Sequence, residues 1–153
     1  MADCIFCQVS AAALPASVVY RDEHAMVILD LFPVHEGHAL VIPHQHCPRV
    51  EDLPDALASH LMALGRATIR AQQAAGLGGD AQNLLINNGP AANQHVPHVH
   101  LHVVPRRRGD TLGTIWNWST RMLVPGAEGR RRKRLDAVAG RLAACFKVPD
   151  INA

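Results

Sequence analysis

Histidines recur at every second position in the stretch HVPHVHLHVVPR, which spans residues 95–106. Side chains two positions apart on a β-strand share a face, so His98, His100 and His102 are predicted to lie on one side of a strand whose other side is apolar. Neutral imidazole can ligate a metal, attack as a nucleophile or transfer a proton near neutral pH. The alternative interpretation is that the three histidines are the polar residues of a solvated strand face.

Strand geometry limits how the three imidazoles can share these roles. Cα atoms two residues apart on a strand are separated by about 6.6 Å, so the first and last histidines of the series lie about 13 Å apart. Two neighbouring imidazoles can reach one metal ion, but the full span is awkward for a single ion. We therefore expect the three histidines to perform different tasks.

A second pattern with chemical potential is the pair Cys4 and Cys7, spaced as Cys-x-x-Cys. Such a pair can be half of a zinc site, a redox pair or two unconnected thiols. The redox interpretation requires a thioredoxin-like strand and helix around the pair, which its position at the extreme N-terminus does not favour. A structural zinc requires four ligands, so two more must come from elsewhere in the chain.

The apolar patterns predict the strands that position these residues. Five strands are predicted, at residues 17–21, 25–30, 37–42, 83–88 and 98–104. Pro43 and Pro105 are expected to end the third and the fifth strand, where a missing backbone N–H costs least. The strands follow one another in hairpin-like pairs instead of alternating with helices, which favours an antiparallel sheet.

Helical spacing of leucines predicts a helix at residues 53–75, with Asp52 as its N-cap and Gly76 at its C-terminal end. A second helix is predicted at residues 127–146. Together with the strands, these two helices indicate an α+β domain in which an antiparallel sheet of about five strands carries the helices on one face.

Length and composition narrow the class of protein. The 153 residues can bury the core of one domain, which we expect to span residues 1–153, and the 48% of hydrophobic residues argue against disorder. The formal net charge of +2 is too small to indicate a nucleic-acid-binding protein. Neither a membrane span nor a signal peptide is predicted, so we expect no membrane partner and a cytoplasmic protein. There, the four cysteines would bind metal or stay as thiols.

The histidine pattern resembles the signature motif of the histidine triad (HIT) family, in which three histidines alternate with hydrophobic residues. Five segments, one of which contains the histidine motif, are similar to HIT proteins and occur in the same order: CIFCQV, LPASVVYRDEHAMVILD, GHALVIPHQH, NLLINNGPAANQHVPHVHLHVVPR and GDTLGTIWNW. They cover most of residues 4–118, whereas the predicted helix at 127–146 carries little family signal. The resemblance implies a single HIT-like domain.

The resemblance also implies an enzyme, a hydrolase or nucleotidyl transferase acting at the α-phosphate of purine nucleotides. The triad His98, His100 and His102 would form its catalytic centre, with His100 attacking phosphorus to give a covalent nucleotidyl-histidine. A backbone carbonyl of the same strand would hold the proton of His100, and His102 would donate to the phosphate. Dinucleoside polyphosphates, nucleoside phosphoramidates and adenylylated small molecules are the implied substrates. The alternative is a nucleotide-binding regulatory protein with little turnover.

Nucleotide contacts follow from the same resemblance. The residues implied to bind the nucleotide are Asp30, Leu31, Ile5, Phe6, Asn87, Gln94, His95 and His38. Asp30 would accept hydrogen bonds from the ribose hydroxyls, and the apolar residues, joined by Val9 and Ile28, would enclose the base. Asn87 and Gln94 would lie at the phosphate. His95 stands where many family members have serine or threonine, so it is a candidate general acid for the leaving group.

The zinc-containing bacterial-type members of the family imply a structural zinc on Cys4, Cys7, His46 and His98. Cys47 and His44 remain alternatives to His46. Such a four-ligand site would pin the N-terminus to the triad strand without taking part in the chemistry. A magnesium ion is a further possible cofactor with a polyphosphate substrate.

Two features outside these sets carry weaker expectations. The arginines at 106–108 follow the triad and are expected to attract a polyphosphate, whereas the basic run at 130–134 is interpreted as a solvated helix start. Trp116 and Trp118 stand out in a chain with few aromatic residues. In the HIT family this segment often reaches a second subunit, so the resemblance implies a homodimer.

Overall fold

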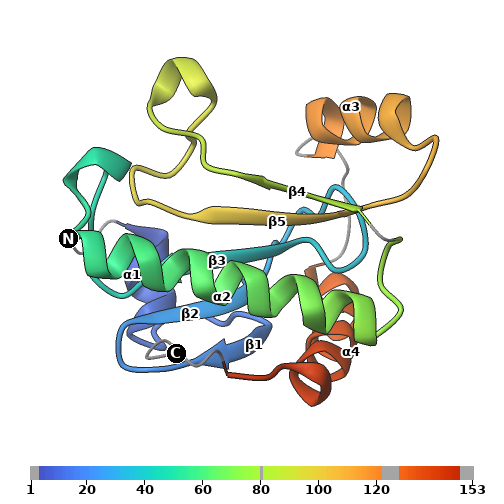
Figure 1. Cartoon of the computed structure of the whole chain (residues 1–153), viewed down its shortest axis with the longest axis horizontal. Helices are drawn as coiled ribbons and strands as arrows, with labels where there is room; N and C mark the ends of the chain where they lie inside the picture. Colours follow the sequence, from blue (N-terminus) through green and yellow to red (C-terminus); the bar gives the residue numbers. More distant parts are fainter. Residues whose placement is uncertain (1–3, 80, 122–127, 149–153) are drawn as a thin grey trace.

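Five strands form one antiparallel sheet in the computed structural model, which describes residues 4–79, 81–121 and 128–148 (Figure 1). The strands are β1 (Val18–Arg21), β2 (Ala25–Leu29), β3 (Ala39–Pro43), β4 (Ala81–Leu85) and β5 (Leu101–Arg106). Their order across the sheet is β1-β2-β3-β5-β4. The predicted α+β class with an antiparallel sheet of five strands is therefore confirmed.

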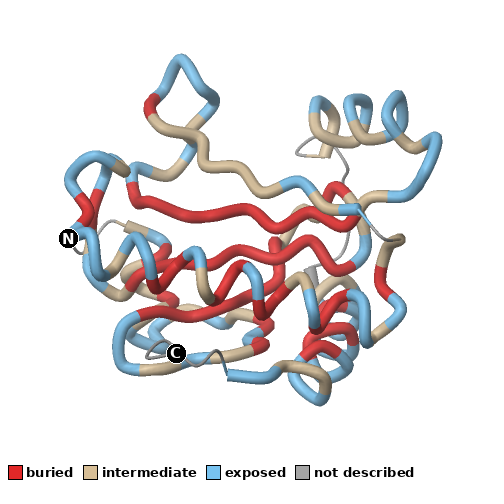
Figure 2. The backbone as a smooth tube through the Cα atoms, in the orientation of Figure 1, coloured by how far each residue is buried: buried red, intermediate tan, exposed pale blue. Residues whose placement is uncertain are grey.

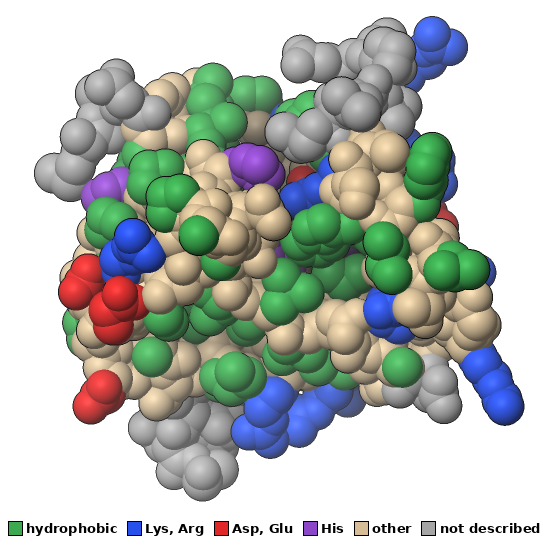
Figure 3. Space-filling view, turned by 90° about the horizontal axis from the view of Figure 1, so that it is seen from above, with side chains coloured by type: hydrophobic (Ala, Val, Ile, Leu, Met, Phe, Trp, Pro, Cys, Tyr) green, Lys and Arg blue, Asp and Glu red, His purple; other side chains and the backbone are tan. Residues whose placement is uncertain are grey.

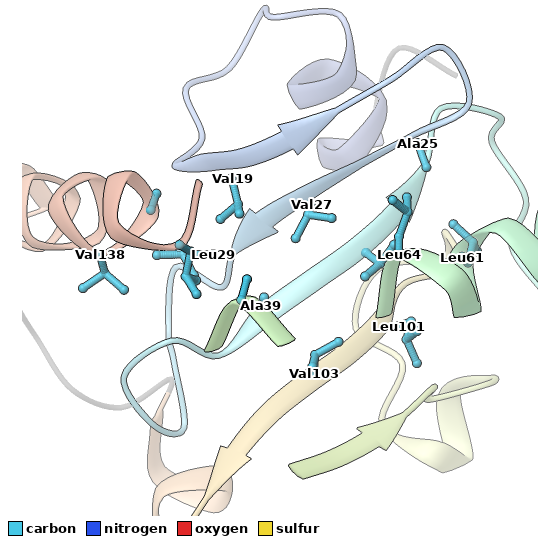
Figure 4. Packing of buried hydrophobic residues seen from close by; sticks show 14 of the residues in the cluster. Val19, Ala25, Val27, Leu29, Ala39, Leu61, Leu64, Leu101, Val103 and Val138 are labelled. Atoms are coloured by element: carbon cyan, nitrogen blue, oxygen red, sulfur yellow. The ribbon is translucent and has the colours of Figure 1, made fainter. Parts of the chain in front are cut away.

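Two long helices, α2 (Asp55–Ala74) and α4 (Glu128–Cys145), cover one face of this sheet (Figure 1). Odd-numbered strand residues such as Val27 and Val103 pack there against Leu64 of α2 and Leu142 of α4. Figure 4 shows this core close up, with Val27, Leu64 and Val103 between the strands and α2. The predicted helix at 53–75 is confirmed, as is the one at 127–146 except for residue 127, which lies outside the described residues.

The opposite face carries two helices that the sequence patterns do not predict, α1 (Ile5–Ser10) and α3 (Thr111–Thr120). Phe6 and Val9 of α1 pack on the even-numbered strand residues Ile28 and Leu40. The helix α1 has only 6 residues, too few to display a helical period. The sequence predicts helices on one face only, and this prediction is wrong because α1 and α3 lie on the other face. This second face bears the histidines.

The ends of some elements differ from the predicted ones. The strand predicted at 98–104 is paired only from Leu101, and it continues through Pro105. Because β3 pairs with β5 only at residues 101–103, the missing N–H of Pro105 lies beyond that ladder. The strand predicted at 83–88 is β4, Ala81–Leu85, since its last partner on β5 is His102. Short 3₁₀ turns, η1 (Val50–Asp52) and η2 (Pro90–Ala92), lie in the connections.

The capping residues of α2 are predicted correctly only at its C-terminal end. Asp52 lies in η1, and Pro54 occupies the N-cap position without a side-chain cap. Gly76, with a φ of +66°, follows the last helical turn, where the Leu77 N–H donates to the Gln72 carbonyl at 2.9 Å. None of the helices in the described ranges combines the length and apolar composition that crossing a bilayer requires.

Burial is greatest at the centre of the sheet, where β2 and β3 are buried along their whole length (Figure 2). The strand β5 is buried at every position except Arg106, whereas the edge strand β4 is only partly covered. Neighbours therefore hold β5 on both faces. This packing gives rigid support to the triad histidines, which lie just before β5 and near its start.

Candidate active site and metal centre

The three triad histidines share one side of the chain but lie in three different environments. His98, His100 and His102 are 0%, 7% and 2% exposed, so they are not the polar residues of a solvated face. His98 points to the N-terminal cysteines, His102 points to His38, and His100 lies between them on the wall of a cavity. This arrangement fits three separate tasks.

His100 is held in one tautomer by the backbone. Its Nδ1 donates to the carbonyl oxygen of His98, 2.7 Å away, so Nε2 of the neutral ring carries a lone pair. Burial lowers the pKa of His100, and the hydrogen bond to the carbonyl opposes this shift only in part. The edge of the Phe6 ring packs against the imidazole, with 5.0 Å between ring centroids. An oriented, neutral imidazole with one unprotonated nitrogen is what a nucleophile requires.

A chain of hydrogen bonds fixes the tautomer of His102. The Val34 N–H donates to Nδ1 of His38 at 3.2 Å, so the proton of His38 lies on Nε2. That nitrogen donates to Nδ1 of His102 at 2.9 Å, which leaves the proton of His102 on Nε2. Burial holds the pKa of His38 well below its usual range and lowers that of His102 to about 2, so both rings stay neutral. Because His102 Nε2 is buried without a partner among the described residues, its N–H can bind an anionic oxygen.

Asp30 follows β2 and has both carboxylate oxygens occupied. Oδ1 accepts the Phe32 N–H at 2.9 Å, and Oδ2 accepts from Nη1 of Arg121 at 2.6 Å. The ligand atoms of Asp30, His38 and His102 lie within 4.8 Å of one another, which a metal site also requires. Their hydrogen bonds already account for this proximity, so we assign the cluster to proton positioning.

A cavity of about 400 Å³ opens beside His100 and His102. Six of the eight residues predicted to bind the nucleotide line its wall: Ile5, Phe6, Asp30, Leu31, Asn87 and His95. Val9 and Ile28 line it as well, so most of the wall is apolar and suited to a flat aromatic base. Viewed from above, a histidine and a basic side chain lie beside a hollow that hydrophobic side chains surround (Figure 3).

The remaining two predicted residues, Gln94 and His38, do not line this cavity. Gln94 accepts the Gly89 N–H at 2.6 Å and donates to the Pro48 carbonyl at 2.9 Å, so it braces the loop that carries Asn87. His38 lies behind His102. Both act on the cavity through their neighbours.

The sequence patterns did not identify the two arginines of the cavity wall, Arg121 and Arg132. Arg121 lies 91 positions from its partner Asp30, so no local pattern connects the two residues. The second basic run begins α4 and is largely exposed, as predicted, but one residue of each run departs from the expectation. Arg106 of the first run is paired with Asp110 at 2.6 Å, whereas the second run supplies Arg132 to the cavity.

A cysteine–histidine cluster lies on the other side of His100. Cys4 Sγ is 3.4 Å from His98 Nδ1, Cys7 Sγ is 3.4 Å from His46 Nδ1, and the two nitrogens are 3.3 Å apart. Ligand atoms around a tetrahedral zinc with bonds of about 2.0–2.3 Å lie about 3.3–3.8 Å apart, so the donor set fits this ion.

The protonation of the cluster suits a metal as well. His98 Nε2 donates to the Pro43 carbonyl at 2.9 Å, so Nδ1 faces the thiols unprotonated, and burial lowers the pKa of His98 to about 4. Burial and the adjacent Cys4 raise the pKa of Cys7, so the thiolate form of Cys7 is favoured only beside a cation. His44, an alternative zinc ligand, is instead hydrogen-bonded through Nδ1 to Ser10 Oγ at 2.7 Å. Cys47, the other alternative zinc ligand, donates from Sγ to the Arg49 carbonyl at 3.2 Å.

Comparison with known proteins identifies the class to which this fold and site belong. The HIT domain family model matches residues 11–109, which is more than half of the chain. The chain therefore belongs to the HIT family.

Three relatives show how closely the chain resembles known members. The adenylylsulfatase HINT3 of Arabidopsis thaliana is 34% identical over 149 residues, which cover 95% of this chain and 68% of that protein. The adenosine 5′-monophosphoramidase HNT1 of Saccharomyces cerevisiae is 34% identical over 117 residues, which cover 76% and 70%. A zinc-bound histidine triad family protein from Mycobacterium smegmatis has a similar structure, with a TM-score of 0.73, 37% identity and coverage of 94% and 97%.

Proposed function

We propose that this protein is a nucleotide hydrolase that acts at the α-phosphate of purine nucleotides through a covalent nucleotidyl-histidine. The observation that carries the proposal is the fixed tautomer of His100, whose Nδ1 donates to the His98 carbonyl beside an apolar cavity. The activities named for the relatives, an adenylylsulfatase and an adenosine 5′-monophosphoramidase, support the same reaction class.

In the first step, the lone pair of His100 Nε2 forms a bond to the α-phosphorus. The bond from phosphorus to the leaving group breaks, and the leaving group departs with the electron pair. It takes a proton from His95, which lies exposed at the cavity and serves as the general acid. The His102 Nε2–H donates to a phosphate oxygen as negative charge develops there.

In the second step, water attacks the same phosphorus and the P–N bond breaks. The electron pair returns to His100 Nε2, and the proton lost by the water restores His95. The products are a nucleoside 5′-monophosphate and the protonated leaving group, so atoms and charge balance. Division of the displacement into two steps lowers the barrier at a crowded, anionic phosphorus.

The nucleotide is proposed to bind with its base between the apolar residues of α1 and β2 and with its ribose at Asp30. Ile5, Phe6 and Ile28 supply apolar surface for the base, which selects weakly among purines because few polar groups reach it. Asn87 lies at the phosphate end with His95. Nothing in the described part of the chain supports the magnesium ion considered for a polyphosphate substrate, and no step here requires it.

The cysteine–histidine cluster is proposed to hold one structural zinc through Cys4, Cys7, His46 and His98. A zinc ion bound there would neutralise the two thiolates and fix the N-terminus against the triad. The zinc-bound relative supports this assignment. We also propose a cytoplasmic location, where the reduced state of the two thiols is maintained.

Replacement of the nucleophile tests the proposal. His100→Ala should lower kcat on adenosine 5′-phosphoramidate and adenosine 5′-phosphosulfate by at least about 10⁴-fold, the range in which loss of a nucleophile falls. The affinity for AMP should change little. A wild-type reaction quenched in alkaline denaturant, which preserves P–N bonds, should show the mass of protein plus AMP.

The matched control is His24→Ala, since His24 is an exposed histidine outside the cavity. It should keep full activity and form the adduct. Tight nucleotide binding without turnover by the wild type would instead identify a nucleotide-binding regulatory protein. Turnover that survives in His100→Ala would exclude the covalent mechanism.

A further inference from the structure

The relay of hydrogen bonds that ends at His102 can carry its protons in either of two directions. In the direction described above, the Val34 N–H donates to His38 Nδ1, and His38 Nε2 donates to His102 Nδ1. In the reverse direction, His38 would carry its proton on Nδ1 and accept at Nε2 from the Nδ1–H of His102. The Nε2 of His102 would then hold a lone pair in place of a proton. Only the first direction gives a donor for a phosphate oxygen.

A carboxylate lies close enough to His38 to favour the reverse direction. Oδ2 of Asp30 is 3.6 Å from His38 Nδ1, and a movement of a few tenths of an ångström would allow a hydrogen bond between them. A bond from an imidazole N–H to a carboxylate is charge-assisted and about twice as strong as the neutral bond that the Val34 N–H makes. With a free oxygen, Asp30 would therefore draw the proton of His38 to Nδ1.

Arg121 removes this competition because it occupies the same oxygen. Its Nη1 donates to Oδ2 of Asp30 at 2.6 Å and to the Phe32 carbonyl at 3.2 Å. The Arg121 and Asp30 side chains are each 11% exposed, so solvent screens their ion pair little. The guanidinium lies 4.7 Å from the centroid of the Trp118 ring, and this ring stacks on His38 with 6.0 Å between centroids. These contacts hold the guanidinium on the carboxylate.

We propose that Arg121 is a positioning residue that sets the direction of the relay, so that the Nε2–H of His102 faces the phosphate. Arg121 acts through Asp30, because it keeps Oδ2 of this carboxylate from His38. The inference rests on the proposed function, in which His102 donates to a phosphate oxygen. A ribose hydroxyl bound to Asp30 would use a further lone pair of the carboxylate, which leaves the ion pair intact.

Long-range proton–nitrogen NMR spectra of the histidine rings test this inference, because they report which nitrogen carries the proton without nucleotide or turnover. In the wild type, His38 and His102 should both carry it on Nε2. Arg121→Met keeps the length of the side chain but removes its donors and charge, so it should move the proton of His102 to Nδ1. The kcat on adenosine 5′-phosphoramidate should fall by about 10²-fold or more, as for loss of one donor to a developing oxyanion.

Three further variants separate this role from general effects. Arg121→Lys should keep the wild-type tautomers and most of the activity, because an ammonium can also occupy Oδ2. The double variant Asp30→Asn/Arg121→Met lacks the competing carboxylate, so His102 should regain its Nε2 proton, which damaged packing around Arg121 would not allow. Arg70→Met is the matched control, since Arg70 is an exposed arginine of α2 on the opposite face of the sheet, and it should keep the tautomers and kcat. Circular dichroism checks that each variant is folded.

The outcomes separate this inference from the proposed function. An Nδ1 proton on His102 in the wild type, or wild-type tautomers in folded Arg121→Met, would overturn the role of Arg121. An equal change in Arg70→Met would do the same, because the effect would then come from net charge. A double variant that keeps the Nδ1 proton would exclude Asp30 as the competing acceptor and overturn the inference as well. A wild type with the expected tautomers that hydrolyses neither adenosine 5′-phosphoramidate nor adenosine 5′-phosphosulfate would instead reject the proposed function and leave the relay standing.

Discussion

At the scale of single residues, the site depends on imidazoles that are kept neutral by burial and oriented by hydrogen bonds. His100 is oriented by a carbonyl two residues earlier in its own chain, and His102 by a relay that begins at the Val34 N–H. Neither orientation requires a carboxylate. Among the described residues, Asp30 is the carboxylate that acts on the two rings, and it is paired with Arg121.

The pH dependence of catalysis follows from the lowered pKa of His100. A lowered pKa means that the nucleophile stays unprotonated below its ordinary value of 6.5, so kcat/KM should lose activity only at a more acidic pH. Initial rates across the acidic range with adenosine 5′-phosphosulfate measure this limb. His95→Asn should lower the rate on adenosine 5′-phosphoramidate, whose leaving amine must take up a proton, without moving the midpoint. An acidic midpoint at or above 6.5 would contradict the assignment of His100.

At the scale of elements, α1 cannot be stable by itself. It has 6 residues and no side-chain N-cap, whereas isolated helices shorter than about 12 residues are marginal in water. Its position depends on Phe6 and Val9, which pack on the sheet, and on the cysteine–histidine cluster at its start. Because α1 forms one wall of the nucleotide cavity, a change at the cysteine–histidine cluster should also displace residues of the cavity wall.

Removal of the proposed zinc should therefore affect both stability and binding. We expect one zinc per chain by elemental analysis, and chelation or Cys4→Ser should lower Tm by at least about 5 °C, which corresponds to roughly 2 kcal/mol in a domain of this size. The affinity for AMP should fall in parallel. Cys145→Ser, at the far end of α4, is the control; it should leave the zinc content unchanged and lower Tm by less than Cys4→Ser, because Cys145 only packs against the edge of the core. A zinc-free protein of normal Tm would refute the cluster as a metal site.

At the scale of the whole molecule, the helix α4 extends the fold beyond the residues 11–109 that match the family model. Its buried residues Leu135, Val138 and Leu142 belong to the same core as the sheet and α2. Ser17 at the start of β1 donates to Asp136 of α4 at 2.6 Å. We therefore propose that residues 1–153 fold as one domain.

The homodimer implied by the family resemblance is a prediction at this scale. The helix α3 exposes Leu112, Ile115 and Trp116, at 83%, 60% and 70%, next to the edge strand β4 (Figure 1). Exposed apolar surface of this kind commonly marks an interface. Light scattering coupled to gel filtration should give the mass of two chains.

Substitution of Trp116 tests whether α3 forms that interface. Trp116→Asp should shift the protein towards the monomer, because it places a charge in an apolar contact. Met62→Asp introduces the same charge at an exposed apolar position of α2 and should not change the mass. A wild-type monomer at every concentration would refute the dimer, and a dimer that tolerates Trp116→Asp would exclude α3 from its interface.

Local patterns in the sequence were sufficient for the orientation of residues within their own elements. Period-two spacing put His98, His100 and His102 on one side of the chain, and helical spacing located α2 and α4, because both periods follow directly from backbone geometry. These patterns did not predict the short helices α1 and α3. A period of 3.6 residues needs several turns before it can be recognised.

Contacts between elements were decided by the tertiary structure. His38 meets His102 because β3 and β5 are antiparallel neighbours with Leu40 opposite His102. Cys4 reaches His98 across 94 positions, and Arg121 reaches Asp30 across 91. Periodicity reports which side of its own element a residue faces, but the order of strands and the packing of helices decide what lies opposite.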